Sequence, residues 1–359
     1  MNRPAIAPAA ISLKSIFRNS DKKNLIVTGS KKIGKSTLLR AAFPDISHSL
    51  LSTAVMSVHT HPDRILLGCS DCPDASVIGI YRTDHMEPQP EGFLPGIQTI
   101  ERFITTGAES VLIDEIGFLE SASLPYQQAL ERLFDAVPVI ASVRKQSTPL
   151  IDRLTSREDT LVVDLDDWYG RDVRIGCIVM ASGFATRFKS NKLLADFGSK
   201  PLISHLLGNL CLTPGCTAVV VTRYPEVQKL AENAGLKCVL HNEPALSDTI
   251  RLGIDALPGM EGYMLCVADQ PYLTSETLEA LVTMFRSLPD QIIRVRCGDT
   301  PGNPVIFPAR FKSELQSLTG ENGGRTVIRA HMDALRFLDI TDARELFDID
   351  TADALPANP

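Results

Sequence analysis

The sequence lacks the long apolar runs of a membrane protein, since none of its runs is long enough to span a bilayer. The N-terminal segment, with Pro4, Pro8 and only a short apolar stretch before Lys14, lacks the core of a secretory signal. The 8 cysteines stand mostly alone within apolar segments, which suits a reduced cytoplasm better than a disulfide framework. The net charge of −7 disfavours a nucleic-acid-coating surface. We therefore expect a cytoplasmic protein that binds neither membranes nor nucleic acid.

The 359 residues are enough for two domains, each with its own core, and 44% apolar residues are ordinary for a globular chain. Short apolar runs alternate with helix-like segments in both halves, which predicts α/β domains with mostly parallel sheets. Each half also contains a loop with glycine and basic residues directly after an apolar run. The two loops differ in design, which suggests two coupled nucleotide-dependent steps, or one step and its regulator.

The first loop fits the pattern G-x-x-x-x-G-K-S/T, with Gly29, Gly34, Lys35 and Ser36 at the fixed positions. An apolar run precedes it, and a helix-like segment begins at Thr37. The glycines let backbone N–H groups point at phosphates. Lys35 is expected to reach the β- and γ-phosphates, and the Ser36 hydroxyl to bind Mg²⁺. We predict a nucleoside triphosphate site, with ATP or GTP as the ligand.

An apolar strand ends in Asp114 and Glu115, two carboxylates that suit a metal ligand and a base that orients water. Together with Gly117, Glu120 and the later Arg144, this segment resembles the small nucleoside-triphosphatases first described from thermophiles. The resemblance covers about residues 22–165. It implies slow hydrolysis of nucleoside triphosphates, with Asp114 at the metal, Glu115 as the hydrolytic residue and Arg144 at the γ-phosphate.

A short segment of the first half has the composition of a metal site. His59, His61, Cys69 and Cys72 lie close together, and Cys69-Ser-Asp-Cys72 has the spacing of a zinc knuckle. A single C-x-x-C without a second one is a weak signal, so a plain loop is the alternative.

The second loop contains Ala181, Ser182 and Gly183, then Arg187 and Lys192. Small residues let the backbone wrap a triphosphate, and the two cations neutralise it and its pyrophosphate leaving group. The loop resembles the signature of nucleotidyltransferases, most closely the MobA-like molybdopterin nucleotidyltransferases. The resemblance spans about residues 174–356.

Further segments carry the same resemblance. Asp269 and Gln270 belong to a segment similar to the family's G-D-Q-P-x-L element, and Asp269 is expected to be the catalytic Mg²⁺ ligand. Ser247 lies in the segment that implies contacts to base and ribose. Gln270 and Asn303 are expected to border the acceptor pocket. Asp348 and Asp350 either place metal or cap a helix.

The resembled reaction transfers a nucleotide from a nucleoside triphosphate to molybdopterin and releases pyrophosphate. Guanylyl-transferring members tend to read Leu-Ala-Gly-Gly and cytidylyl-transferring members Leu-Ala-Ala-Gly, whereas this chain reads Met180-Ala-Ser-Gly183. A side chain at Ser182 narrows the space for the base, which favours CTP over a purine nucleotide. Other acceptors, such as a sugar or alcohol phosphate, stay open because the fold is shared among them.

These resemblances define the expected layout of the chain: an N-terminal extension (1–20), a P-loop domain (21–165), a linker (166–173) and a Rossmann-like, GT-A-type nucleotidyltransferase domain (174–359). The first domain is expected either to hydrolyse its nucleotide and so gate delivery of the cofactor to a target molybdoenzyme or its chaperone, or to act as a binding adaptor only.

Overall fold

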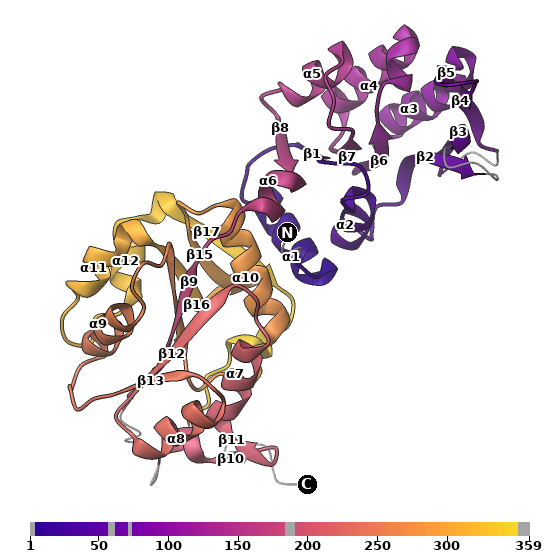
Figure 1. The fold of residues 1–359 in the computed structure, drawn as a ribbon. Coiled ribbons are helices and arrows are strands. Elements are labelled where there is room, and N and C mark those ends of the chain that lie inside the picture. Colours follow the sequence, from indigo (N-terminus) through magenta and orange to yellow (C-terminus); the bar gives the residue numbers. More distant parts are fainter. Residues whose placement is uncertain (1–3, 57–61, 71–73, 184–190, 351–359) are drawn as a thin grey trace. The chain divides into compact units, whose positions relative to one another are not determined.

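The computed structural model describes residues 4–56, 62–70, 74–183 and 191–350. The chain divides into two compact units (Figure 1). Unit 1 contains Met1–Ile6 and Ser20–Gly170, and unit 2 contains Ala7–Asn19 and the chain from Arg171 onward. Both units are α/β with mixed, mostly parallel sheets, which confirms the predicted fold class. In the described part of the chain, no helix has the length and apolarity needed to cross a bilayer.

The sheet of unit 1 has the strand order β5-β4-β3-β2-β6-β7-β1-β8. Strands β2, β6, β7, β1 and β8 are parallel, while β3, β4 and β5 extend the sheet in antiparallel pairs. The strands are β1 (Asn24–Thr28), β2 (His48–Met56), β3 (Pro62–Cys69), β4 (Ser76–Tyr81), β5 (Met86–Pro88), β6 (Val111–Ile116), β7 (Val139–Val143) and β8 (Thr160–Asp164).

Helices cover this sheet and close its core. Helices α3 and α4 pack on one another, and Phe103, Tyr126 and Phe134 on them are buried against the strands. The apolar β1 and β7 are buried throughout, as expected for central strands of a parallel sheet. The helical elements are α2 (Lys35–Ala42), η1 (Pro90–Phe93), α3 (Leu94–Thr106), η2 (Leu119–Ala122), α4 (Leu124–Ala136), α5 (Pro149–Thr155) and α6 (Leu165–Gly170).

Unit 2 is built on a sheet of order β13-β12-β9-β14-β16-β15-β17. Strands β13, β12, β9 and β14 are parallel to one another, and β16 is antiparallel to both of its neighbours. The strands are β9 (Ile175–Ala181), β12 (Cys216–Thr222), β13 (Lys237–Leu240), β14 (Gly262–Val267), β15 (Ile292–Cys297), β16 (Thr300–Pro308) and β17 (Leu335–Ile340), with the small pair β10 (Asp196–Phe197) and β11 (Lys200–Pro201).

Helices lie on both faces of this sheet. Figure 1 shows α9, α11 and α12 on one face and α7 and α10 on the other. The buried core includes Ile178, Tyr263 and Phe307. The helical elements are α1 (Ile6–Arg18), η3 (Lys192–Leu194), α7 (Leu202–Cys211), α8 (Pro225–Asn233), α9 (Leu246–Ala256), α10 (Ser275–Ser287), η4 (Ala309–Phe311), α11 (Lys312–Gln316), α12 (Gly324–Ala330), η5 (Met332–Ala334) and η6 (Ala343–Leu346).

Helix α1, which was expected to be part of a separate extension, packs as part of unit 2. Its Ser12 hydroxyl donates to the Ala280 carbonyl of α10 at 2.7 Å. Asn19, just after the helix, donates to the Phe337 carbonyl at 2.8 Å and accepts from the Phe337 N–H at 3.0 Å. Strand β17 is an edge strand, so these bonds satisfy backbone groups that would otherwise be open to another strand. The main segment of unit 1, Ser20–Gly170, therefore lies in the sequence between α1 and β9 of unit 2.

We predict that Asn19→Ala lowers the stability of unit 2 by about 1–2 kcal/mol, because both Phe337 backbone groups lose a partner. The measurement is the midpoint of its denaturant unfolding transition, followed by far-UV circular dichroism. Asn322→Ala is the control, since its amide bonds only to the nearby Thr319 carbonyl. A wild-type midpoint for Asn19→Ala would show that the side chain does not hold the edge strand.

Candidate functional site

The glycine-rich loop of unit 1 joins β1 to α2, as its sequence predicts. Gly34 has φ +104°, a left-handed conformation that favours glycine, and it directly precedes the helix. Lys35 Nζ lies across the loop and donates to the carbonyls of Gly29 at 2.8 Å and Ser30 at 3.2 Å. Burial lowers the pKa of Lys35, while the nearby Glu115 carboxylate opposes that effect. The loop therefore holds a partly desolvated cation at its centre.

Asp114 lies at the C-terminal end of β6 and is almost fully buried, at 7% exposure. Its carboxylate accepts hydrogen bonds from Ser36 Oγ at 2.5 Å, Ser142 Oγ at 3.0 Å and Arg40 Nη2 at 2.8 Å. Strand β7 lies between β1 and β6, and Ser142 on it bonds to Asp114 and to the Glu115 N–H at the end of β6. The structure thus joins Ser36 and Asp114, and their oxygen atoms are the type of ligand that Mg²⁺ prefers.

Glu115 has a strained backbone. Its φ of +78° is rare for a residue with a side chain and costs about 1–3 kcal/mol. Its N–H donates to Ser142 Oγ at 2.7 Å, and its carboxylate accepts from Arg144 Nε. A Cβ on Gly117 would approach Arg144 Cδ to 2.9 Å, so glycine there leaves room for the arginine side chain. Glu115 and Arg144 both border the cavity at the loop.

Glu120 is buried, at 4% exposure, and accepts from the Gly117 N–H at 2.7 Å. Burial raises its pKa from 4.5 to about 7. Glu120 lines the same cavity of about 660 Å³ as the loop. The predicted residues that border this cavity are Gly29, Gly34, Lys35, Ser36, Thr37, Glu115, Glu120 and Arg144.

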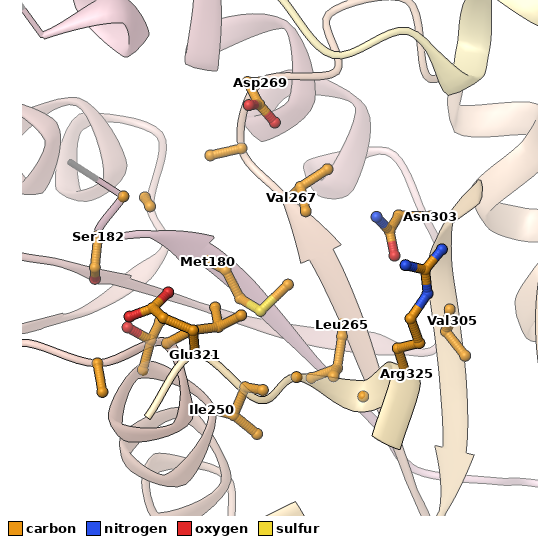
Figure 2. A pocket seen from close by; sticks show the side chains of 18 of the residues that line it. Met180, Ser182, Ile250, Leu265, Val267, Asp269, Asn303, Val305, Glu321 and Arg325 are labelled. Carbon is orange, nitrogen blue, oxygen red and sulfur yellow. The ribbon is translucent and has the colours of Figure 1, made fainter. Parts of the chain in front are cut away.

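In unit 2 the second site forms where β9 and β14 end side by side. Met180 is paired with Val267, so the loop after β9 and Asp269 after β14 leave the same edge of the sheet. Strand β12 lies on one side of β9 and β14 on the other, so the strand order reverses at β9. Open α/β sheets bind ligands at such a switch point, at the carboxyl ends of the strands. A cavity of about 550 Å³ opens there (Figure 2). Its border includes Ala181, Ser182, Gly183, Lys192, Asp269 and Asn303.

Lys192 and Asp269 form the central contact of this cavity. Lys192 Nζ lies 2.5 Å from Asp269 Oδ2 and 3.0 Å from Asp350 Oδ1. The pKa of Lys192 is raised: burial lowers it, but the hydrogen bond and charge of Asp269 and then Asp350 outweigh burial. Partial burial and the neighbouring Asp269 raise the pKa of Asp348 to about 6. These carboxylates fit a divalent cation by their chemistry.

The Ser182 side chain, which was expected to face the base, is buried and hydrogen-bonded to Val221 and His241. It is 6% exposed, and its hydroxyl donates to the Val221 carbonyl at 3.0 Å. His241 Nδ1 accepts from the Glu243 N–H, so the neutral ring carries its proton on Nε2, which lies 2.6 Å from Ser182 Oγ. Burial lowers the pKa of His241 and favours this neutral form. The Ser182 hydroxyl is therefore bound to the protein, while the residue still borders the cavity, so its role in narrowing the base site stays a prediction.

Two of the residues predicted for this site, Ser247 and Gln270, do not border the cavity. Ser247 is buried within α9, whose neighbouring residues Leu246, Thr249 and Ile250 border it instead. Gln270 is 1% exposed, and its amide donates to the Leu346 carbonyl at 3.3 Å, so it fixes the segment that leads to Asp350.

Some of the predicted residues lie outside the described part of the chain. Arg187, the second cation of the transferase loop, is among them, as are His59, His61 and Cys72. Within the described ranges, no three side chains of the His, Cys, Asp and Glu types are placed so that together they could hold one metal ion. The zinc site stays a prediction.

Sequence reasoning missed two arginines of the cavity wall. Arg223 donates to the Ser182 carbonyl at 2.8 Å and to the Glu243 carbonyl at 2.9 Å, and so supports the loop after β9. Arg294 reaches the cavity from β15. Its signal in the sequence was a charged residue within the apolar run of β15, a pattern that also fits an ordinary solvent-exposed side chain.

The two sites define a class of protein: a chain with a P-loop at one cavity and a second, Rossmann-like cavity at the carboxyl ends of parallel strands. Comparison with known families gives each part a family. The MobA-like NTP transferase domain matches residues 177–335, and the NTPase family matches residues 93–172. Both parts of the predicted resemblance are confirmed, and the chain combines a nucleotidyltransferase domain with an NTPase domain.

Individual relatives are distant. Nucleoside-triphosphatase THEP1 of Thermotoga maritima is 21% identical over 155 residues, which cover 40% of this chain and 86% of that protein. Bifunctional protein GlmU of a Jannaschia species is 29% identical over 115 residues, or 30% of this chain and 25% of that protein. The crystal structure of Rv0371c from Mycobacterium tuberculosis is 20% identical with a TM-score of 0.44, covering 51% of this chain and 95% of that one.

We predict that the stability of unit 1 falls as the pH rises from about 4.5 to about 7, the ordinary and folded pKa values of Glu120. In this range the unfolded chain releases the proton that the folded chain keeps, so unfolding is favoured by up to about 3 kcal/mol. Glu120→Gln removes most of this slope. The measurement is denaturant unfolding at a series of pH values, with the exposed Glu109→Gln as control. An equal slope in Glu120→Gln would contradict the prediction.

Proposed function

We propose that unit 2 transfers the cytidylyl group of CTP to molybdopterin and releases pyrophosphate. The observation that supports this proposal is the contact of Lys192 with Asp269 at a cavity that also contains Ala181–Gly183 and Asn303. A cation, a strand-terminal carboxylate and a loop of small residues are the groups that a nucleotidyl transfer needs. The choice of CTP rests only on the difference from the guanylyl-transferring members at position 182.

In the proposed reaction, the backbone of Ala181–Gly183 holds the triphosphate, and Lys192 neutralises its charge. Mg²⁺, held by Asp269, would supply further positive charge at the phosphates. An oxygen of the acceptor phosphate forms a bond to the α-phosphorus. The bond from the α-phosphorus to the bridging oxygen breaks, and pyrophosphate leaves with that electron pair. No covalent enzyme intermediate is needed, so positioning and charge provide the catalysis.

For unit 1 we propose slow hydrolysis of ATP or GTP. Lys35 and the loop backbone would hold the phosphates, Ser36 and Asp114 would hold Mg²⁺, and Glu115 would orient the attacking water. Arg144, which pairs with Glu115 at the same cavity, is the residue we propose for the γ-phosphate. We propose that hydrolysis assists delivery of the finished cofactor to a molybdoenzyme or its chaperone.

The transferase proposal predicts dinucleotide and pyrophosphate from purified protein, molybdopterin, Mg²⁺ and CTP, and less product from GTP or ATP. Asp269→Asn lowers the rate by at least about 100-fold if that carboxylate holds the metal. Asp290→Asn is a control outside the cavity. The dinucleotide is measured by chromatography, and pyrophosphate is measured by a separate assay. Product from a sugar phosphate or alcohol phosphate but not from molybdopterin would reject this acceptor.

The hydrolysis proposal predicts that Glu115→Gln lowers the turnover of ATP or GTP by about 100-fold or more while nucleotide still binds. Phosphate release and equilibrium binding of a fluorescent nucleotide separate the two effects. Glu109→Gln, an exposed carboxylate in the same unit, is the control. If hydrolysis survives in Glu115→Gln, this residue is not the hydrolytic one. If hydrolysis is lost but cofactor maturation survives, the unit works as a binding adaptor.

A further inference from the structure

Two arginines border the cavity of unit 2 without a carboxylate to neutralise them. Arg294 comes from β15 and Arg325 from the first turn of α12. Among the residues that the structure describes, no acidic side chain forms an ion pair with either guanidinium. Arg296 on the same strand is different, since it forms a salt bridge to Asp339 at 2.7 Å. The two cavity arginines therefore keep their charge available for a ligand.

Arg294 is held in a fixed orientation. Its Nε donates to the Gly302 carbonyl at 2.9 Å, and Nη2 lies 3.5 Å from the Pro301 carbonyl. Both carbonyls belong to β16, whose next residue, Asn303, borders the same cavity. Because only one edge of the planar group is anchored to the backbone, its other N–H groups are left for the cavity.

The two guanidinium groups lie close enough to affect each other. Burial lowers the pKa of Arg294, and the charge of Arg325 lowers it further. Two like charges in a partly desolvated space repel each other, and an anion between them would relieve that repulsion. A dianion offers the best match, because each guanidinium can donate two parallel hydrogen bonds to a phosphate.

The position of this pair within the cavity sets its role. Figure 2 shows Arg325 and Asn303 on one side of the cavity and Met180 and Ser182 on the other, with Asp269 at the edge between the two sides. The loop that would hold the donor triphosphate lies on the Ser182 side. Arg325 is thus on the side that remains for the acceptor. Arg294 is anchored to the two carbonyls directly before Asn303, which lies on that same side.

We propose that Arg294 and Arg325, together with the Asn303 amide, bind the phosphate of a phosphate-monoester acceptor and aim one of its oxygens at the α-phosphorus of the donor. This inference rests on the proposed transferase function and adds specificity-determining residues to it. The dianion attacks without first losing a proton, so the step needs no separate base. An acceptor that attacks through an uncharged hydroxyl has no negative charge at its reacting group, so it would not need two arginines there.

The test is binding of inorganic phosphate while a non-hydrolysable CTP analogue with Mg²⁺ occupies the donor site, measured by calorimetry. We expect phosphate to bind the wild type and to bind Arg294→Met and Arg325→Met about 10- to 100-fold more weakly, as the loss of charge-assisted hydrogen bonds implies. Arg296→Gln is the matched control, with the same charge removed from the same strand but from an existing salt bridge. Wild-type phosphate affinity in Arg294→Met and Arg325→Met, or no binding to the wild type, overturns the proposal.

Kinetics gives a second readout that a merely structural role would not move. Arg294→Met should raise the KM for the acceptor about tenfold or more and leave the KM for CTP near the wild-type value. Arg294→Lys restores the charge but not the two parallel N–H donors of the guanidinium group, so it should recover part of that loss. Equal changes in both KM values would contradict the subsite. If no triphosphate yields product with molybdopterin, the proposed function fails, whereas the phosphate-binding assay still decides the role of the arginines.

Discussion

The contact between Lys192 and Asp269 is the interaction on which the site of unit 2 depends. It joins the segment after β9 to the end of β14, and through Asp350 it also holds the chain that follows η6. Three segments far apart in the sequence meet at one ammonium group. Without that cation, several carboxylates would face one another in a partly desolvated cavity, which is an unfavourable arrangement unless a metal or another cation compensates.

In unit 1 the carboxylate at the end of a parallel strand has different partners. Asp114, also at the end of a parallel strand, is surrounded by Ser36, Ser142 and Arg40 rather than by a single lysine. Its lysine, Lys35, stays with the loop carbonyls. In both units the carboxylate is fixed by a parallel strand, whose end always opens towards the ligand side of the sheet. The cation is then supplied by the loop or helix that faces it.

The covalent layout of the chain adds a constraint. Helix α1 protects the edge strand β17 of unit 2 through Ser15 and Asn19, yet the sequence then enters unit 1 before it returns at β9. Unit 2 is complete only with the first helix of the chain. The expected N-terminal extension over residues 1–20 therefore contains a helix that packs in unit 2, and the chain returns to unit 1 at Ser20 and to unit 2 at Arg171.

Local sequence determined the parts whose chemistry lies in a short segment. The P-loop, the strand that ends in Asp114 and Glu115, and the alternation of strands and helices could all be predicted, because backbone geometry and period are local properties. Contacts between distant segments decided the rest. The partners of Ser182, the burial of Ser247 and Gln270, the attachment of α1, and the convergence of Arg294 with Arg325 depend on how strands pack side by side, and no spacing along the chain encodes that.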